Sequence, residues 1–247
     1  MCQKKICWHA APGGDDLQGY DLRVCNCPPF MREWEAKGMK TAWFSPSHDP
    51  IMSDFARNDD RPIDISFAGT YSAAHVARNR LLETIAEAFT ERRVEFRLVY
   101  PKWKRMPFDG ILGKLPLPIY YLPKPLRRVS KGPLFGRPSY ELFSRSKIVI
   151  NAHGEITRGY RGNMRCFEAI GCGACMVSDA GEYSRGLMPG IHFETFKDEA
   201  EAISKIEMIL RHWEEKREMG RKGSEHLKAT LSKSWQWDLF QQLASLQ

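Results

Sequence analysis

An arginine and a glutamate stand three residues apart in the segment GNMRCFEAIGCGACMVSD, which covers residues 162–179. The pattern is that of a loop that opens a helix, followed by two glycines and a short apolar strand. The first turn of a helix presents unpaired backbone N–H groups and the positive end of the helix dipole, and both suit a phosphate group. Arg165 would add a charged fork, and Glu168, on the same helix face, could accept hydrogen bonds from two sugar hydroxyls. The spacing therefore predicts recognition of a nucleotide diphosphate.

Each of these residues also has a purely structural interpretation. Glu168 could be an ordinary first-turn glutamate that only the helix dipole favours. Arg165 could form an ion pair with Glu168 or with Asp179. Asn163 is a good helix N-cap, and capping alone would explain its presence. The sequence leaves both interpretations open.

Three stretches of the chain resemble, in order and spacing, the GT-B glycosyltransferases, and particularly the C-terminal, donor-binding domain of the spore-maturation, CgeB-like branch. The segment above matches the pattern of that branch at Asn163, Arg165, Phe167, Glu168, Gly173, Ala174, Ser178 and Asp179. The stretch DISFAGTYSAAHVARNRLLETIAE, residues 64–87, looks like the opening strand, glycine turn and helix of the donor domain. Residues 20–50 resemble the end of the N-terminal domain and the linker that leaves it. Together the stretches cover most of the chain from Tyr20 onward.

The resemblance implies a hexosyltransferase-like enzyme that binds a nucleotide-diphosphate sugar and transfers the sugar to an unknown acceptor, in the synthesis of a cell-surface or spore polysaccharide or glycan. In similar enzymes the turn after the first strand lies close to the diphosphate, and glycine there lets the backbone approach. The loop at 152–162 would meet the sugar or the phosphates. The nucleotide-sugar-binding residues implied in this way are Gly69, Thr70, His153, Arg161, Asn163, Arg165 and Glu168.

The resemblance names no catalytic residue. Many retaining GT-B enzymes carry two glutamates eight positions apart, and the position eight before Glu168 is Tyr160. Retention and inversion therefore both stay open, and an inverting reaction would need a general base, usually from the N-terminal domain. Enzymes of this class stabilise the departing diphosphate with arginines and helix N-termini, so neither a metal nor another cofactor is expected.

A second class of function stays open because only a partial N-terminal domain precedes residue 61. The chain could be a non-catalytic or partner-dependent nucleotide-sugar-binding module from a truncated transferase. The formal charge of +7 and the pI near 9.0 also fit an anionic membrane surface or a nucleic acid. No RRM or zinc-finger pattern is present, so a nucleic acid is not expected. The expected partners are a nucleotide sugar and a glycan, lipid-linked or protein acceptor, with peripheral membrane contact as a further option.

Composition limits the class of protein. The chain has 247 residues, 43% of them hydrophobic, which is enough for one large domain or two small ones. No run approaches the roughly eighteen apolar residues of a membrane helix, and the N-terminus lacks the apolar core of a signal peptide. We therefore expect a cytoplasmic protein, with membrane association on the cytoplasmic side as an option. The seven cysteines show no paired zinc-ligand spacing, and Cys172 and Cys175 are interpreted as small residues at a helix–strand junction.

Hydrophobic periodicity predicts an α/β fold, a Rossmann-like parallel sheet with helices on both faces, preceded by a partial N-terminal α/β segment. Residues 1–60 would form that segment and a linker, and residues 61–247 the nucleotide-sugar-binding domain, with the C-terminal helix packing back on the N-terminal segment. Strands are expected at 22–25, 41–44, 63–68, 95–100, 147–151, 174–178 and 192–196. Helices are expected at 30–37, 76–92, 140–145, 198–211, 213–230 and 233–246, besides the one that carries Arg165. The proline-rich stretch 101–138 is predicted to be a long irregular connection, with short strands around 119–122 and a solvated basic loop at 124–131.

Overall fold

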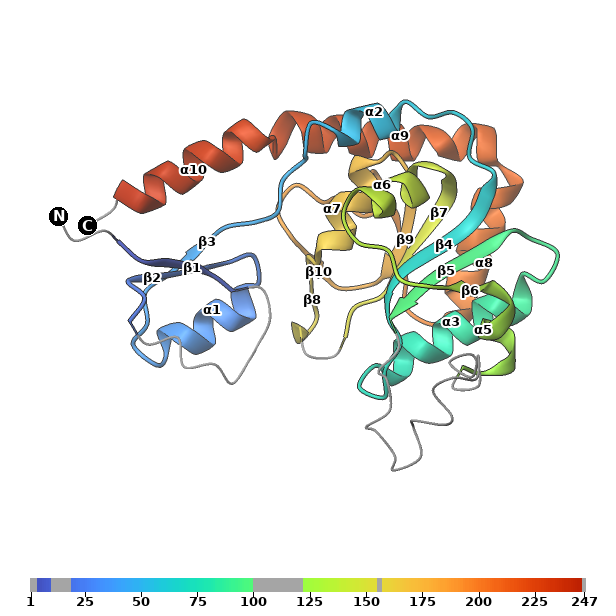
Figure 1. The fold of residues 1–247 in the computed structure, drawn as a ribbon, viewed down its shortest axis with the longest axis horizontal. Coiled ribbons are helices and arrows are strands. Elements are labelled where there is room, and N and C mark those ends of the chain that lie inside the picture. The colour runs from blue at the N-terminus through green and yellow to red at the C-terminus, as the bar shows by residue number, and fades with distance from the viewer. Residues whose placement is uncertain (1–3, 10–18, 100–121, 155–156, 246–247) are drawn as a thin grey trace, which may run out of the picture.

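A computed structural model describes residues 4–9, 19–99, 122–154 and 157–245 of the chain. The main feature is a six-stranded, fully parallel sheet, with the strand order β11-β9-β7-β4-β5-β6 (Figure 1). Its strands are β4 (Ile63–Thr70), β5 (Val94–Val99), β6 (Ser130–Lys131), β7 (Ser146–Asn151), β9 (Cys175–Asp179) and β11 (Glu194–Phe196). The chain builds outward from β4 through β5 to β6, and then returns to the other side of β4 with β7. This reversal is a topological switch point, where open α/β sheets bind ligands.

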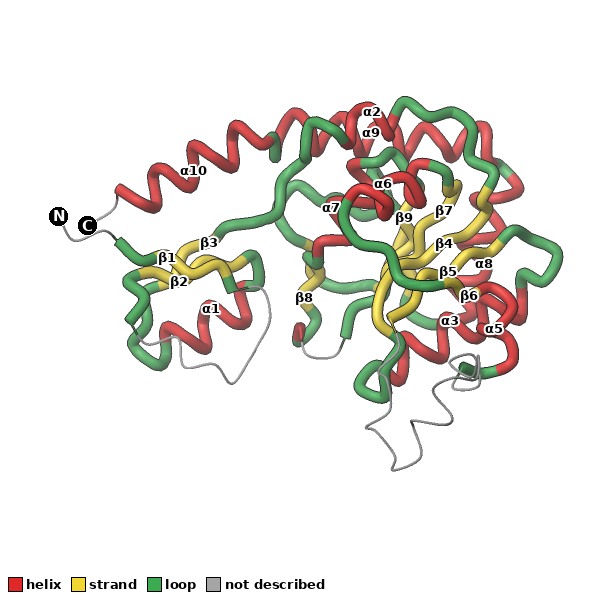
Figure 2. The backbone as a smooth tube through the Cα atoms, in the orientation of Figure 1, coloured by secondary structure: helices red, strands yellow, loops and turns green. Residues whose placement is uncertain are grey.

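Helices cover both faces of this sheet, as Figure 2 shows. One face packs against α3 (Val76–Ala88), α5 (Lys124–Val129) and α8 (Glu199–Arg211), in a core that includes Phe67 and Ile148. The other face packs against α2 (Met52–Ala56), α6 (Arg137–Ser144), α7 (Met164–Gly171) and α9 (Trp213–Thr230). The predicted α/β fold, with a parallel sheet and helices on both faces, is confirmed.

A second, three-stranded parallel sheet precedes the large one. It has the order β1-β2-β3, with β1 (Ile6–Trp8), β2 (Leu22–Cys25) and β3 (Thr41–Trp43). Helix α1 (Pro28–Glu35) packs on one face through Phe30. The C-terminal helix α10 (Lys233–Ser245) packs on the other face, where Leu239, Phe240 and Leu243 meet Leu22 and Val24. Because α10 directly follows α9, the end of the chain joins the two sheets.

Two short features complete the fold. Strands β8 (Tyr160–Arg161) and β10 (Glu182–Tyr183) pair in parallel and connect the loop before α7 with the loop after β9. In the part of the chain that the structure describes, no helix is long and apolar enough to cross a membrane.

The basic run at 124–131 corrects one prediction, because it forms α5 and β6 instead of a solvated loop. Leu126 and Val129, three residues apart, are buried in the core and hold the helix on the sheet. Proline in the first turn suits a helix start, so the high proline content of residues 101–138 does not by itself indicate irregular structure. The short strands predicted around 119–122 fall mainly on residues 100–121, which lie outside the described residues.

Candidate functional site

A cavity of about 460 Å³ lies between the carboxyl ends of the two parallel sheets. Trp8 ends β1 and Asn26 follows β2 on one side, and Gly69 and Thr70 end β4 on the other. The Asn26 side chain donates a 2.5 Å hydrogen bond to the Gly162 carbonyl, which ties the small sheet to the loop before α7. The cavity therefore lies at the switch point, where a ligand is expected.

The N-terminus of α7 forms one wall of this cavity. Asn163 is the N-cap residue, and its Oδ1 accepts a 3.3 Å hydrogen bond from the backbone N–H of Cys166. Gly162, Asn163 and Met164 all line the cavity. The unpaired N–H groups of the first turn therefore lie beside the cavity, and an anion site there stays a prediction.

Arg165 lies along the end of β4 instead of pairing with an acid. Its Nε donates to the Ala68 carbonyl at 2.7 Å, and its Cζ lies 4.4 Å from the centre of the Phe67 ring. Burial and the nearby Arg78 guanidinium lower the pKa of Arg165 to about 10, so it stays charged at neutral pH. Within the described residues no carboxylate lies within ion-pair distance of it, so the ion-pair interpretation is not supported. Arg165 therefore lines the cavity as a cation whose hydrogen bonds go to neutral acceptors, the Ala68 carbonyl and Asn151 Oδ1.

Asn151, the last residue of β7, is a functional candidate that the sequence reasoning missed. It is fully buried, and its Oδ1 accepts hydrogen bonds from Arg165 Nη1 at 2.7 Å and from Asn163 Nδ2 at 3.0 Å. Its Nδ2 donates to Ser178 Oγ at 3.0 Å and to Cys166 Sγ at 3.2 Å. The Asn151 amide therefore orients both polar side chains at the start of α7, Asn163 and Arg165. The available signal was a polar residue at the carboxyl end of a buried strand.

Glu168 lies one turn further along α7 and also lines the cavity. Burial raises the pKa of its carboxyl group, and the opposing effect of the Arg165 charge is smaller. Within the described part of the chain, no hydrogen-bond donor reaches this carboxylate. A partly buried acceptor beside a cation is suited to two neighbouring hydroxyl groups.

The side chains of Arg165 and Phe67 lie so close to the backbone of residue 69 that only glycine fits there. A Cβ atom there would overlap Nη2 of Arg165 and would lie 2.9 Å from Cζ of Phe67. Thr70, the next residue, is exposed at the end of β4, and its carbonyl accepts a 2.6 Å hydrogen bond from Arg78. The glycine at this turn therefore makes room for the arginine that faces the cavity.

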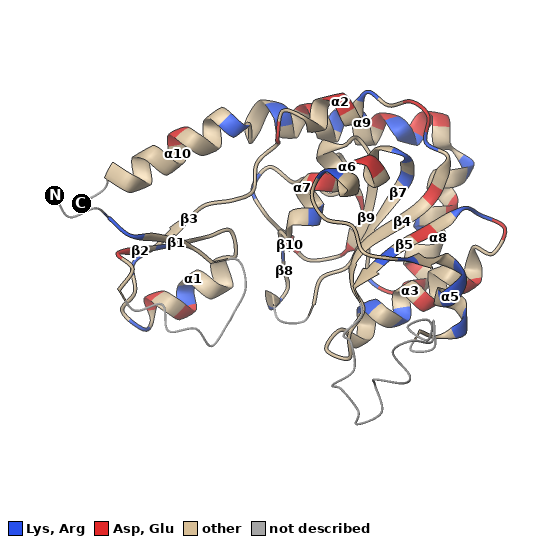
Figure 3. Ribbon diagram, in the orientation of Figure 1, with Lys and Arg blue, Asp and Glu red and all other residues tan. Residues whose placement is uncertain are grey.

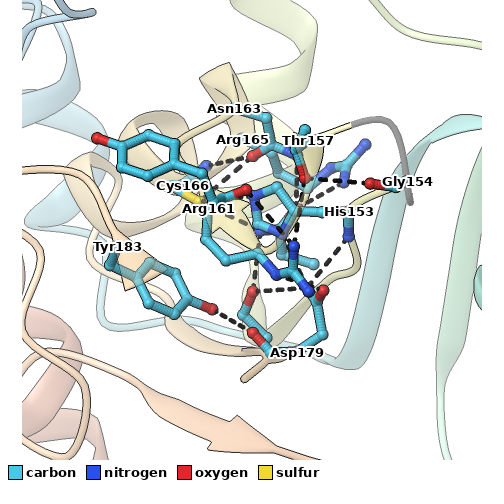
Figure 4. A network of polar contacts seen from close by, with 12 residues as sticks. His153, Gly154, Thr157, Arg161, Asn163, Arg165, Cys166, Asp179 and Tyr183 are labelled. Atoms are coloured by element: carbon cyan, nitrogen blue, oxygen red, sulfur yellow. Dashed lines mark hydrogen bonds and ion pairs between the residues drawn. The ribbon is translucent and has the colours of Figure 1, made fainter. Parts of the chain in front are cut away.

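His153 and Arg161 lie apart from the other five predicted residues. They line a second cavity, of about 440 Å³, on the other side of the loop before α7. Both contact Asp179: Arg161 Nε lies 2.6 Å from Oδ2, and His153 Nδ1 lies 2.8 Å from Oδ1 (Figure 4). Burial alone would raise the pKa of Asp179, but these contacts lower it, whereas burial lowers the pKa of His153. A neutral histidine and an ionised aspartate thus anchor the loop.

Helix α3 carries two further arginines, Arg78 and Arg80. The Arg80 side chain is 76% exposed and forms an ion pair with Glu199 at 3.2 Å. Arg78 lies closer to the site, because it contacts the end of β4 and lines the second cavity.

Cys166, His153 and Asp179 have the order of a nucleophile, a base and an orienting acid. Cys166 Sγ lies 3.8 Å from His153 Nε2. The thiol is nevertheless fully buried, and this burial raises its pKa to about 12. A protonated thiol that no substrate can reach is not a nucleophile, so the three residues support the loop.

Residues 78–241 match the model of a family described as glycosyl transferase-like. None of the curated proteins matches the sequence.

Several solved structures share the fold, which is that of the GT-B glycosyltransferases. A mutant of T4 phage BGT in complex with UDP-glucose has a TM-score of 0.63 at 13% identity, covering 98% of this chain and 74% of that one. Anabaena HepE in complex with UDP-glucose has a TM-score of 0.60 at 13% identity, and the match covers 93% of this chain and 65% of HepE. Sucrose-phosphate synthase from Thermosynechococcus elongatus has a TM-score of 0.52 at 16% identity, and the match covers 92% of this chain and 59% of the synthase. The chain thus spans less than two thirds of the length of the last two structures.

Proposed function

Because the chain belongs to the glycosyl transferase-like family, we propose that it binds a nucleoside-diphosphate sugar between its two sheets and transfers the sugar to an acceptor. The observation that carries this proposal is the wall formed by α7, where the helix N-terminus, Arg165 and Glu168 face one cavity. Phosphate and paired hydroxyl groups are the two chemistries that this wall suits, and a nucleoside diphosphate carries both. Two proteins with similar structures were solved with UDP-glucose, which supports the donor class.

Each residue of the wall has a role in the proposed complex. The Glu168 carboxyl group accepts hydrogen bonds from the ribose hydroxyls, and the first-turn N–H groups of α7 bind the diphosphate. Arg165, held by Asn151, stabilises the negative charge that develops on the departing diphosphate. This electrostatic role needs no metal ion. Gly69 and Thr70 border the diphosphate, and His153 and Arg161 act through the loop that they anchor to Asp179.

The branch of the family, the domain bounds and the cellular role are also proposals. The pattern around Glu168 supports the CgeB-like branch, with residues 61–247 as the donor-binding domain and a cytoplasmic role in glycan synthesis. The second candidate is a donor-binding module that needs a partner chain for transfer. This chain covers 59% and 65% of two of the neighbouring structures, so the transfer activity of a whole enzyme is a proposal for it.

Ligand binding tests the proposal directly. The purified chain is titrated with UDP, GDP, ADP and CMP and their sugar conjugates, by calorimetry and by thermal shift, since a ligand specific for the native state raises the melting temperature. We expect one diphosphate to bind, and Glu168→Gln to weaken it by about tenfold, because a neutral amide accepts hydroxyl hydrogen bonds less strongly. Glu141→Gln, on α6 and outside the cavity, is the matched control.

The same purified protein distinguishes the two candidate functions, a complete transferase and a donor-binding module. Transfer or hydrolysis of the bound sugar nucleotide by the chain alone would favour the complete enzyme, and binding without turnover would favour the module. If no nucleotide binds, or if Glu141→Gln weakens binding as much as Glu168→Gln does, the proposed donor site is wrong.

A further inference from the structure

Trp8 contributes to two hollows of the surface. Besides the donor cavity, it lines an apolar groove of about 470 Å³ between the outer face of the small sheet and α10. The groove is lined by Ile6, Trp8, Val24, Phe44, Lys233, Gln236, Trp237 and Phe240. Trp8 therefore lines both hollows, which places one side of the groove next to the donor cavity.

Aromatic rings follow one another along this groove. The ring centres of Trp8 and Phe44 are 4.9 Å apart, those of Phe44 and Phe240 are 6.3 Å apart, and Phe240 stacks on Trp237 at 5.8 Å. The rings at the two ends are open to solvent, with Trp8 46% and Trp237 58% exposed. A continuous, accessible row of large aromatics on a soluble surface indicates a binding site for an apolar group.

The chemistry of the lining favours a hydrocarbon chain over a sugar. Only Lys233 and Gln236 contribute polar groups beyond the indoles. The amide of Gln236 is already engaged, because its Oε1 accepts from Ser47 Oγ at 2.9 Å and its Nε2 donates to the Ser45 carbonyl at 2.6 Å. Sugar hydroxyls in the groove would lose their hydrogen bonds to water without replacing them, which costs free energy, whereas methylene groups would gain from burial.

Charge marks one end of the groove. Lys233 is the first residue of α10, and Figure 1 shows that this helix starts beside the helices of the large sheet and runs outward over the small sheet. Lys233 thus stands at the end of α10 that is nearer to the large sheet, and most of this helix carries neither basic nor acidic side chains (Figure 3). A ligand with a phosphate at that end and an alkyl chain along the aromatic rings would match both features.

We infer that the groove binds the hydrocarbon chain of a lipid-linked, phosphate-bearing acceptor, with Trp8 at the point where its headgroup enters the donor cavity. The inference rests on the proposed function, because it assigns an acceptor to that reaction. Lys233 meets the phosphate, and the aromatic row from Phe44 to Trp237 covers the chain. The acceptor hydroxyl then approaches the sugar from the small sheet, opposite the α7 wall.

Dodecyl phosphate, kept below its micelle-forming concentration, is the probe for this site. Calorimetry and tryptophan fluorescence follow its binding to the full chain, with dodecyl maltoside as a neutral alkyl probe and maltotriose as a free glycan. We expect both alkyl probes to bind, maltotriose not to bind, and Trp237→Gln to weaken both by at least about tenfold. Lys233→Gln should weaken dodecyl phosphate alone. Tyr20→Gln, which removes another exposed aromatic outside the groove, is the matched control.

Three results would overturn the inference. Alkyl binding that is unchanged in Trp237→Gln would place the chain elsewhere, and maltotriose binding that Trp237→Gln abolishes would make the groove a glycan site. A dimer in solution that Trp237→Gln dissociates would assign the groove to a second copy of the chain. UDP affinity, measured in the same variants, should not change because neither residue lines the donor cavity. A wild type that binds dodecyl phosphate but no nucleotide would refute the proposed function separately.

Discussion

Replacing Asn151 by aspartate tests whether the buried amide sets the charge of the donor cavity. Asn151→Asp keeps the size of the side chain and both acceptor contacts, with Arg165 Nη1 at 2.7 Å and Asn163 Nδ2 at 3.0 Å. It adds a negative charge next to the arginine that we assign to the diphosphate. We expect the fold to persist and the affinity for the diphosphate to fall.

The size of the effect follows from Coulomb's law. A phosphate bound by the far edge of the Arg165 guanidinium would lie roughly 6–7 Å from the new carboxylate, and at an effective dielectric constant of about 20 the repulsion is about 2–3 kcal/mol. This corresponds to a loss of affinity of roughly 30- to 150-fold. The two hydrogen bonds from Nδ2 to Ser178 and Cys166 are also lost, at about 0.5–1.5 kcal/mol each. The new ion pair with Arg165 offsets part of that loss, so stability should change by less than about 2 kcal/mol.

Calorimetric titration with the diphosphate that the wild type binds, together with urea unfolding, measures both quantities. Asn58→Asp adds the same charge at a residue outside the donor cavity, where Asn58 donates to the Ser144 carbonyl, and should leave the affinity within about threefold. An Asn151→Asp protein that folds and binds the diphosphate as tightly as the wild type would refute the assignment of Arg165 to the diphosphate.

Two further substitutions give opposite effects on stability. Burial raises the pKa of Glu168, so its contribution to stability is fully present below the ordinary value of 4.5 and is lost as the pH rises through the raised pKa. Glu168→Gln should therefore melt at a higher temperature than the wild type at pH 7, with the difference vanishing near pH 4; an equal or lower melting temperature at pH 7 would contradict this. Gly69→Ala should cost about 1–3 kcal/mol in denaturant unfolding and weaken diphosphate binding, because the added methyl group displaces Arg165 and crowds Phe67. Gly132→Ala, where an added Cβ meets nothing within 4 Å, is its control, and equal effects of the two alanines would contradict the steric argument.

The regular elements of the large sheet could be predicted because each has a hydrophobic pattern of its own. Strands β4, β7 and β9 each contain several apolar residues between loops, and the helices from α8 to α10 keep a helical period over thirteen or more residues. Strands β8 and β10 have two residues each, which is too short for any pattern to show. The sequence does not predict helix α5, because prolines such as Pro123 at its N-cap and Pro125 in its first turn are also typical of loops; only its packing on the sheet shows the helix.

In the candidate site, local sequence determined only the features that belong to helix α7 itself. The cap at Asn163 and the shared face of Arg165 and Glu168 follow from spacing along α7, since residues three apart meet on one turn. Tertiary structure decided which strand ends meet that helix. Asn151 reaches Arg165 because β7 lies beside β4 in the sheet, and Asp179 draws His153 and Arg161 into a different cavity. Strand order in a parallel sheet arises from long-range pairing, to which no single stretch of sequence corresponds.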